Sequence, residues 1–137
     1  MPVVDTEVIF ALKPSDPKHQ HAMNLLQSNT SLVAPDSAIF EFQIVLRGRG
    51  TDDNNIKAAL GAVHEVLLNH NVTEIKTIDS NLLMLQCDIE DNYHLSYFDS
   101  LIAASALFWD QQIVSDDDFF DRVPNLERIP LTRSDSD

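Results

Sequence analysis

Short apolar runs alternate along this chain with stretches in which apolar residues recur every three or four positions. The runs predict strands at Pro2–Val4, Ser31–Ala34, Thr73–Ile78 and Gln112–Val114, and an edge strand at Glu127–Leu131. The last is assigned to an edge because a central strand does not tolerate Pro130. Strands that alternate with helices predict an α/β fold built around a parallel sheet.

Helices are expected between these strands, where side chains that cap a helix precede periodic apolar residues. A short helix carrying Val8 and Ile9 ends before Pro14, and Asp16–Pro17 resembles the start of the next helix. The later helices have their predicted caps at Asp36, Thr51, Asp79 or Ser80, and Ser96. We expect three of them to run to about Arg47, to about Cys87 and over Tyr97–Phe108, and the helix after Thr51 to be the longest.

The length of 137 residues suits one domain, which we predict over residues 1–131, followed by a frayed polar tail at 132–137. No apolar run approaches the ~18 residues of a membrane span, and no N-terminal signal pattern is visible, so a cytoplasmic protein is expected. The single cysteine, Cys87, excludes an internal disulfide and is expected to be a small buried apolar residue.

The charge is strongly unbalanced, with 9 Lys and Arg residues against 22 Asp and Glu residues and a formal net charge of −13. This balance argues against broad, sequence-independent binding of nucleic acid. It fits a basic protein partner, or a surface adapted to salt. Arg47-Gly48-Arg49 is the one local basic cluster. It either stabilises a helix C-terminus or contacts RNA phosphates.

Four acids, far apart in the sequence, lie in or beside apolar runs that are expected to pack into the core. Asp5 and Asp117 follow predicted strands, Glu41 lies within an apolar helix, and Asp99 lies in the first turn of another helix. A carboxylate among apolar residues is costly unless it is paired, hydrogen-bonded or bound to a metal. Right-handed crossovers bring such strand and helix ends to one side of a sheet. Converging carboxylates repel one another, which predicts a site for divalent cations and phosphodiester chemistry.

Three of the acids also have simpler explanations. Asp5 alone is interpretable as a helix cap, and Asp99 as part of a capping box with Ser96. Asp117 belongs to an acidic run of three residues that suits a solvated turn. Glu41 is the exception, because its neighbours on both sides are phenylalanines.

Taken in order, the sequences around these acids resemble a known family. The segments are Val4-Asp5-Thr6, Phe40-Glu41, Tyr97-Phe98-Asp99-Ser100-Leu101-Ile102-Ala103-Ala104, and the run from Ile113 to Leu126. From Val3 to Leu131 the chain resembles the PIN-domain ribonucleases, and most closely the VapC-type toxins of toxin–antitoxin pairs. The resemblance implies a three-layer α/β/α fold with a central, mostly parallel sheet of four to five strands.

The resemblance also implies a site and partners. Asp5, Glu41, Asp99 and Asp117 would bind Mg²⁺ or Mn²⁺, with Asp116 as the second choice for the last position, and Thr6 and Ser115 would support them. The implied activity is metal-dependent hydrolysis of RNA, with Arg47 or Arg49 as candidate RNA contacts. The implied partners are a basic antitoxin and a second copy of the chain in a homodimer.

Other features leave alternatives open. Glu7 stands where the family usually has Asn or another small polar residue, so it either binds metal or impairs catalysis, and an inactive PIN-like binding module is the second hypothesis. A receiver-like signalling domain is disfavoured, because the first strand carries only Asp5 and no suitable Lys is found. Phe120 is expected in the core and Phe119 is free to stack on a base, whereas Trp109 suits either the core or a dimer contact.

Overall fold

Five short parallel strands form a single sheet in residues 1–132, the part of the chain that this computed structural model describes. They are β1 (Val3–Val4), β2 (Val33–Pro35), β3 (Thr73–Ile75), β4 (Gln112–Val114) and β5 (Glu127–Ile129). The order across the sheet is β3-β2-β1-β4-β5. Strands β2 and β3 therefore lie on one side of β1, and β4 and β5 lie on its other side.

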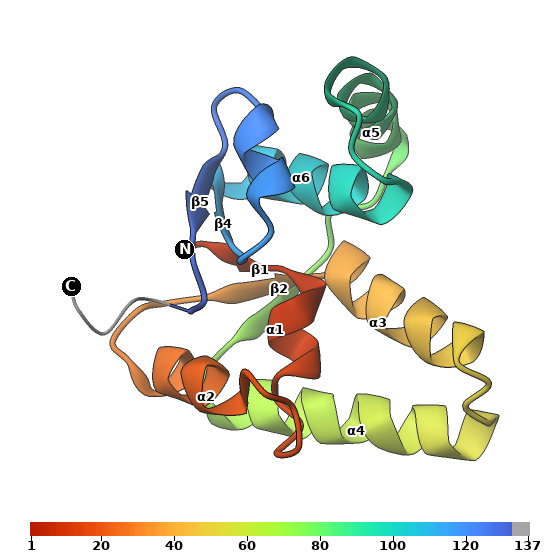
Figure 1. Cartoon of the computed structure of the whole chain (residues 1–137), viewed down its shortest axis with the longest axis vertical. Coiled ribbons are helices and arrows are strands. Elements are labelled where there is room, and N and C mark those ends of the chain that lie inside the picture. The colour runs from red at the N-terminus through yellow and green to blue at the C-terminus, as the bar shows by residue number, and fades with distance from the viewer. Residues whose placement is uncertain (133–137) are drawn as a thin grey trace.

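Helices cover both faces of the sheet, as the resemblance implies. They are α1 (Thr6–Phe10), α2 (His19–Gln27), α3 (Asp36–Gly48), α4 (Asp53–Asn69), α5 (Ser80–Tyr93), α6 (Tyr97–Trp109) and the 3₁₀ helix η1 (Asp118–Arg122). Figure 1 shows α5 and α6 on one side of the sheet, and α1, α2 and α4 on the other. The predicted α/β/α fold is confirmed. No helix in residues 1–132 has the length and apolar character needed to cross a membrane.

The core lies where α6 packs against the central strands. Val3, Val4 and Ile113 of β1 and β4 are at most 1% exposed, as expected for strands that are covered on both faces. On α6, every residue from Ser100 to Ala106 is buried. Three of these are alanines, so the helix can approach the sheet closely. This packing fixes the start of α6, and therefore Asp99, relative to β1 and β4.

Two of the predicted helix caps, at Thr51 and Asp36, are wrong by one residue. Asp52 caps α4 in place of Thr51, since its carboxylate accepts the backbone N–H of Asn55 at 2.8 Å. Asp36 is the first residue of α3 and not its cap. Its carboxylate is instead bound by the N–H and hydroxyl groups of Thr77. Asp79 and Ser96 are confirmed as caps of α5 and α6.

The expectation that Cys87 is buried is wrong. Helix α5 continues to Tyr93, beyond the predicted end near Cys87, and Cys87 lies on its exposed face. Trp109, at the end of α6, is 44% exposed and so does not belong to the core. Of the two interpretations offered for it, the dimer contact remains. Phe120 is fully buried, as predicted, and Phe119 is 46% exposed. The predicted tail begins at Thr132, and its remaining residues, 133–137, lie outside the described residues.

Candidate active site

The carboxyl edge of the sheet gathers the four acids from four elements. Asp5 directly follows β1, and Asp117 lies just beyond β4. These two strands are neighbours where the strand order reverses, which is the point at which open α/β sheets form their sites. Helix α3 starts from the same edge after β2 and carries Glu41. Helix α6 leads back to the start of β4, so its first turn, with Asp99, also lies at this edge.

Asp5 is the most enclosed of the four acids, at 6% exposure. One carboxylate oxygen accepts the backbone N–H of Thr6 at 2.7 Å, so Asp5 does cap α1. The other oxygen accepts the hydroxyl of Ser115 at 2.7 Å. The Ser115 oxygen in turn accepts the N–H of Asp117 at 3.0 Å. Ser115 therefore links the acid after β1 to the acid after β4.

Burial raises the pKa of Asp5 to about 7. The hydrogen bonds from Ser115 and Thr6 lower this pKa, but they do not offset the loss of hydration. The negative charges of Glu7 and Asp99 raise it further. Near neutral pH, a substantial fraction of Asp5 is therefore protonated unless a cation binds beside it.

The carboxyl groups of Glu41 and Asp99 also have raised pKa values. Burial raises the pKa of each carboxyl, while side-chain hydrogen bonds with Thr6 and Ser96, respectively, lower it. The charge of Asp99 raises the pKa of Glu41, and the charge of Asp117 raises the pKa of Asp99. The four acids are thus an electrostatically coupled set.

The apolar enclosure expected around Glu41 is only partial. Glu41 itself is half-buried, and two of its apolar neighbours on α3, Phe40 and Ile44, are 44% and 37% exposed. This face of α3 therefore borders solvent, and Glu41 lies at the rim of the coupled set.

The coupled set has no cationic partner among residues 1–132. The ion pairs that Lys and Arg side chains form there go to Glu7, Asp116, Asp53 and Asp121. Four carboxylates without a counter-charge are the oxygen ligands that Mg²⁺ and Mn²⁺ prefer. In residues 1–132, however, no three His, Cys, Asp or Glu side chains are grouped so as to hold one ion. The residue types fit a hard divalent cation, and the carboxylates would have to turn toward it.

Asp116 and Glu7 form a hydrogen-bonded network with Lys18 beside the coupled set, and the charge of Glu7 also acts on Asp5. The Lys18 ammonium lies 2.9 Å from Asp116 and 3.6 Å from Glu7, and Glu7 also accepts the N–H of Asp116. The backbone N–H and the hydroxyl of Thr132 bind the Asp116 carboxylate at 2.9 and 2.8 Å. Burial raises the pKa of Asp116, but the bonds from Lys18 and Thr132 outweigh it and leave that pKa below its usual value. The role of Lys18 was not foreseen, since Asp116 is 98 residues away in the sequence.

The predicted RNA contacts differ from one another in their surroundings. Arg47 pairs with Asp53 at 3.1 Å on the exposed ends of α3 and α4. Arg49 caps the C-terminus of α3, and its guanidinium carbon lies 4.9 Å from the centroid of the Phe10 ring. Phe119, the candidate for base stacking, is covered on one face by Arg122 at 4.5 Å.

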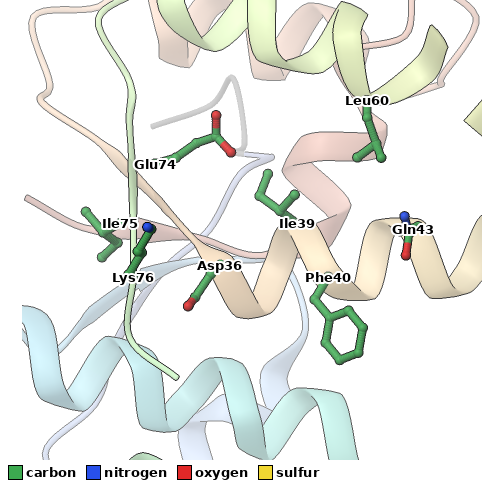
Figure 2. Close-up of a pocket in the computed structure, with 8 residues that line it drawn as sticks. All are labelled: Asp36, Ile39, Phe40, Gln43, Leu60, Glu74, Ile75 and Lys76. Atoms are coloured by element: carbon green, nitrogen blue, oxygen red, sulfur yellow. The ribbon is translucent and has the colours of Figure 1, made fainter. Parts of the chain in front are cut away.

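A pocket of about 360 Å³ lies apart from the four acids, between α3, α4 and β3. Figure 2 shows Ile39, Phe40 and Gln43 projecting from α3, with Leu60 reaching in from α4. Asp36 also lines this pocket, but Thr77 already binds its carboxylate. Glu74, the other acid in its lining, pairs with His64, so we assign this pocket no chemistry.

The family model of the PIN domain matches residues 3–126 of this chain. The chain belongs to the PIN-domain family. The matched region contains all four coupled acids of this PIN domain, and Ser115 and Thr6 as well.

Solved structures with the same fold include toxins and toxin–antitoxin complexes. VapC20 of Mycobacterium tuberculosis, described as a sarcin-ricin loop cleaving toxin, is 19% identical, with a TM-score of 0.67 over 88% of this chain and 93% of that chain. VapBC2 of Rickettsia felis, bound to a DNA fragment from its promoter, is 16% identical, with a TM-score of 0.66 over 93% and 96%. FitAcB of Neisseria gonorrhoeae is 16% identical, with a TM-score of 0.64 over 96% and 98%. At these identities the similarity shows the fold. Among curated proteins, none matches this PIN domain.

Proposed function

We propose that this PIN domain is a metal-dependent endoribonuclease and acts as the toxin of a toxin–antitoxin pair. The observation that carries the proposal is the coupled set of Asp5, Glu41, Asp99 and Asp117, which lies at the switch point of the sheet without a cationic partner in residues 1–132. Membership of the PIN-domain family and the likeness to VapC structures support the same activity.

In this proposal Asp5, Glu41, Asp99 and Asp117 are the metal ligands. A bound Mg²⁺ or Mn²⁺ would supply an activated water and stabilise the charge on the phosphoryl oxygens. The Ser115 hydroxyl donates to Asp5, which fixes the direction of that carboxylate, and it holds the backbone at Asp117. Thr6 also fixes Asp5 through its N–H, and its hydroxyl donates to the carbonyl of Ala38 on α3, three residues before Glu41.

The second hypothesis, an inactive PIN-like module, is favoured by Glu7 and by the strong negative charge of the chain. Because Glu7 is paired with Lys18 and accepts the N–H of Asp116, we assign it a structural role in holding the turn after β4. Asp116, the alternative ligand, is engaged by Lys18 and Thr132 in the same network. We therefore propose Asp117 as the fourth ligand.

The proposed partners follow from the surface of the chain. A net charge of −13 favours a basic antitoxin, and one solved structure with this fold is a toxin–antitoxin complex from Klebsiella pneumoniae. Exposed apolar residues on α3 and at the end of α6, including Phe40, Phe108 and Trp109, suit contacts with a partner or with a second copy in a homodimer. An RNA target and a protein antitoxin would place this activity in the cytoplasm.

Removal of the metal tests this function. We expect the purified protein to cleave RNA with Mn²⁺ or Mg²⁺, to lose cleavage in EDTA, and to regain it when Mn²⁺ is restored. Water is the nucleophile in this account, so the products should carry no 2′,3′-cyclic phosphate ends. Gel analysis of a panel of labelled structured and single-stranded RNAs measures both. Cleavage that persists in EDTA would contradict the mechanism, and a lack of cleavage with every RNA and metal would favour the inactive module.

A further inference from the structure

A second pocket adjoins the four acids on the side of α1. It has a volume of about 540 Å³ and lies between the turn that follows α1 and the C-terminus of α3. Glu7 and Lys18 form its boundary with the acid set, because both bind Asp116, the neighbour of Asp117. Phe10, Lys13 and Arg49 line its remaining walls.

Positive charge gathers in this pocket although the chain as a whole is acidic. Lys13, Lys18 and Arg49 are three of the nine Lys and Arg residues in the sequence. Two carboxylates, Glu7 and Asp16, also line the pocket, and Asp116 pairs with Lys18, so the positive charge open to a ligand is that of Lys13 and Arg49. The remainder of a chain with a net charge of −13 repels a polyanion, so this pocket is a local exception.

The cations in the pocket are not equally available to a ligand. Lys18 is engaged by Asp116 and Glu7. Lys and Arg ion pairs in residues 1–132 otherwise involve Arg47 and Arg128, which leaves Lys13 and Arg49 without one in that part of the chain. Arg49 is instead stacked on Phe10, whose ring packs against Phe42 with centroids 4.7 Å apart. Stacking holds the guanidinium over the ring and leaves its N–H groups free to donate.

We propose that this pocket binds one phosphate of the RNA strand, adjacent to the phosphodiester that is cleaved, through Arg49 and Lys13. The proposal rests on the ribonuclease function proposed above. A planar guanidinium and an ammonium in one pocket suit a phosphate group, which accepts charge-assisted hydrogen bonds from both. Lys13 and Arg49 are the two lining cations outside the ion pairs of residues 1–132, and two cations suit a single phosphate. Binding of one phosphate in this pocket would keep the RNA strand next to the four acids, so the protein would not need a broad basic surface.

The binding test uses a single-stranded RNA oligonucleotide and protein carrying Asp99→Asn, so that RNA is not consumed. We expect Lys13→Ala with Arg49→Ala to weaken affinity by about tenfold, as for the loss of hydrogen bonds to a charged group. Loss of one phosphate contact should also reduce the slope of log affinity against log salt by about 0.7. Fluorescence anisotropy across a KCl series measures both. Lys57→Ala with Lys76→Ala is the matched control, since it removes two exposed lysines that do not line this pocket, and should change neither value.

A kinetic test uses protein with Asp99 intact and separates this pocket from the acid set. Bis(p-nitrophenyl) phosphate has no neighbouring phosphate, so we expect the double variant to hydrolyse it at the wild-type rate while its KM for RNA rises about tenfold. If the wild type cleaves RNA and the double variant keeps wild-type affinity and salt slope, the phosphate pocket is wrong and the ribonuclease stands. Equal losses on both substrates would also overturn the pocket. If the wild type neither binds nor cleaves RNA, both proposals fail.

Discussion

Replacement of Asp99 by Asn is expected to lower the rate of RNA cleavage by at least ~100-fold, since even the outer partners of metal ligands typically contribute 10- to 100-fold. Asp99 is coupled to Asp5, Glu41 and Asp117 through its charge, so it is the acid that connects the set. The amide keeps the size of the side chain, and the backbone N–H of residue 99 still donates to Ser96. The helix start should therefore survive while one anionic ligand is lost.

A matched control for this variant is Asp118→Asn. Asp118 is an exposed acid in the first turn of η1, next to Asp117, and its replacement removes the same charge. We expect it to retain cleavage within a few-fold of the wild type. Single-turnover rates at saturating Mn²⁺ make the comparison. Full activity in Asp99→Asn, or equal losses in both variants, would show that the coupled set does not carry the reaction.

The stability of the metal-free protein is expected to fall as pH rises from about 4 to about 7. Asp5 has a pKa of about 7 in the folded chain against 3.8 for the ordinary carboxyl, so the folded state holds a proton that the unfolded state has released over this interval. At ~1.4 kcal/mol per pH unit, the ionisation of Asp5 alone should lower the free energy of unfolding by about 4 kcal/mol over this interval. The raised pKa values of Glu41 and Asp99 act in the same direction.

Asp5→Asn should remove most of this pH dependence. Asn retains a carbonyl oxygen to accept one of the bonds from Thr6 and Ser115, and it carries no charge to be dehydrated. The variant is therefore expected to gain stability relative to the wild type as pH rises toward 8. Urea unfolding in EDTA from pH 4.5 to 8 measures the difference. The lowered pKa values of Asp116 and Asp121 act only below about pH 4, outside this window. Parallel pH profiles for both proteins would contradict the assignment.

Features that depend on local sequence could be predicted well. Ser96 and Asp99 mark the start of α6, and the apolar run at Ile113 and Val114 marks β4, because caps and buried strands leave short-range patterns. The positions of Asp5 and Asp117 at one sheet edge follow from parallel strands alone. The metal-ligand assignment itself remains a prediction.

Features that depend on distant contacts could not be predicted. The pairing of Lys18 with Asp116 joins the start of α2 to the turn after β4, and no local pattern indicates it. This contact changes the interpretation of Glu7, which the sequence alone presents as a charge that either binds metal or impairs catalysis. The exposure of Cys87 has a similar cause. Helix α5 lies at the surface with only one face covered, and the apolar residues before Cys87 include the 60% exposed Met84.

A crystal structure of the protein with Mn²⁺, using the anomalous signal of the metal, tests the central claim most directly. We predict manganese at the carboxyl edge of the sheet, with oxygens of Asp5, Glu41, Asp99 and Asp117 as direct or water-linked ligands. Asp116 should remain bound to Lys18 and Thr132. Manganese that is absent from this edge at saturating concentration, or carboxylates that do not share one pocket around it, would contradict the claim.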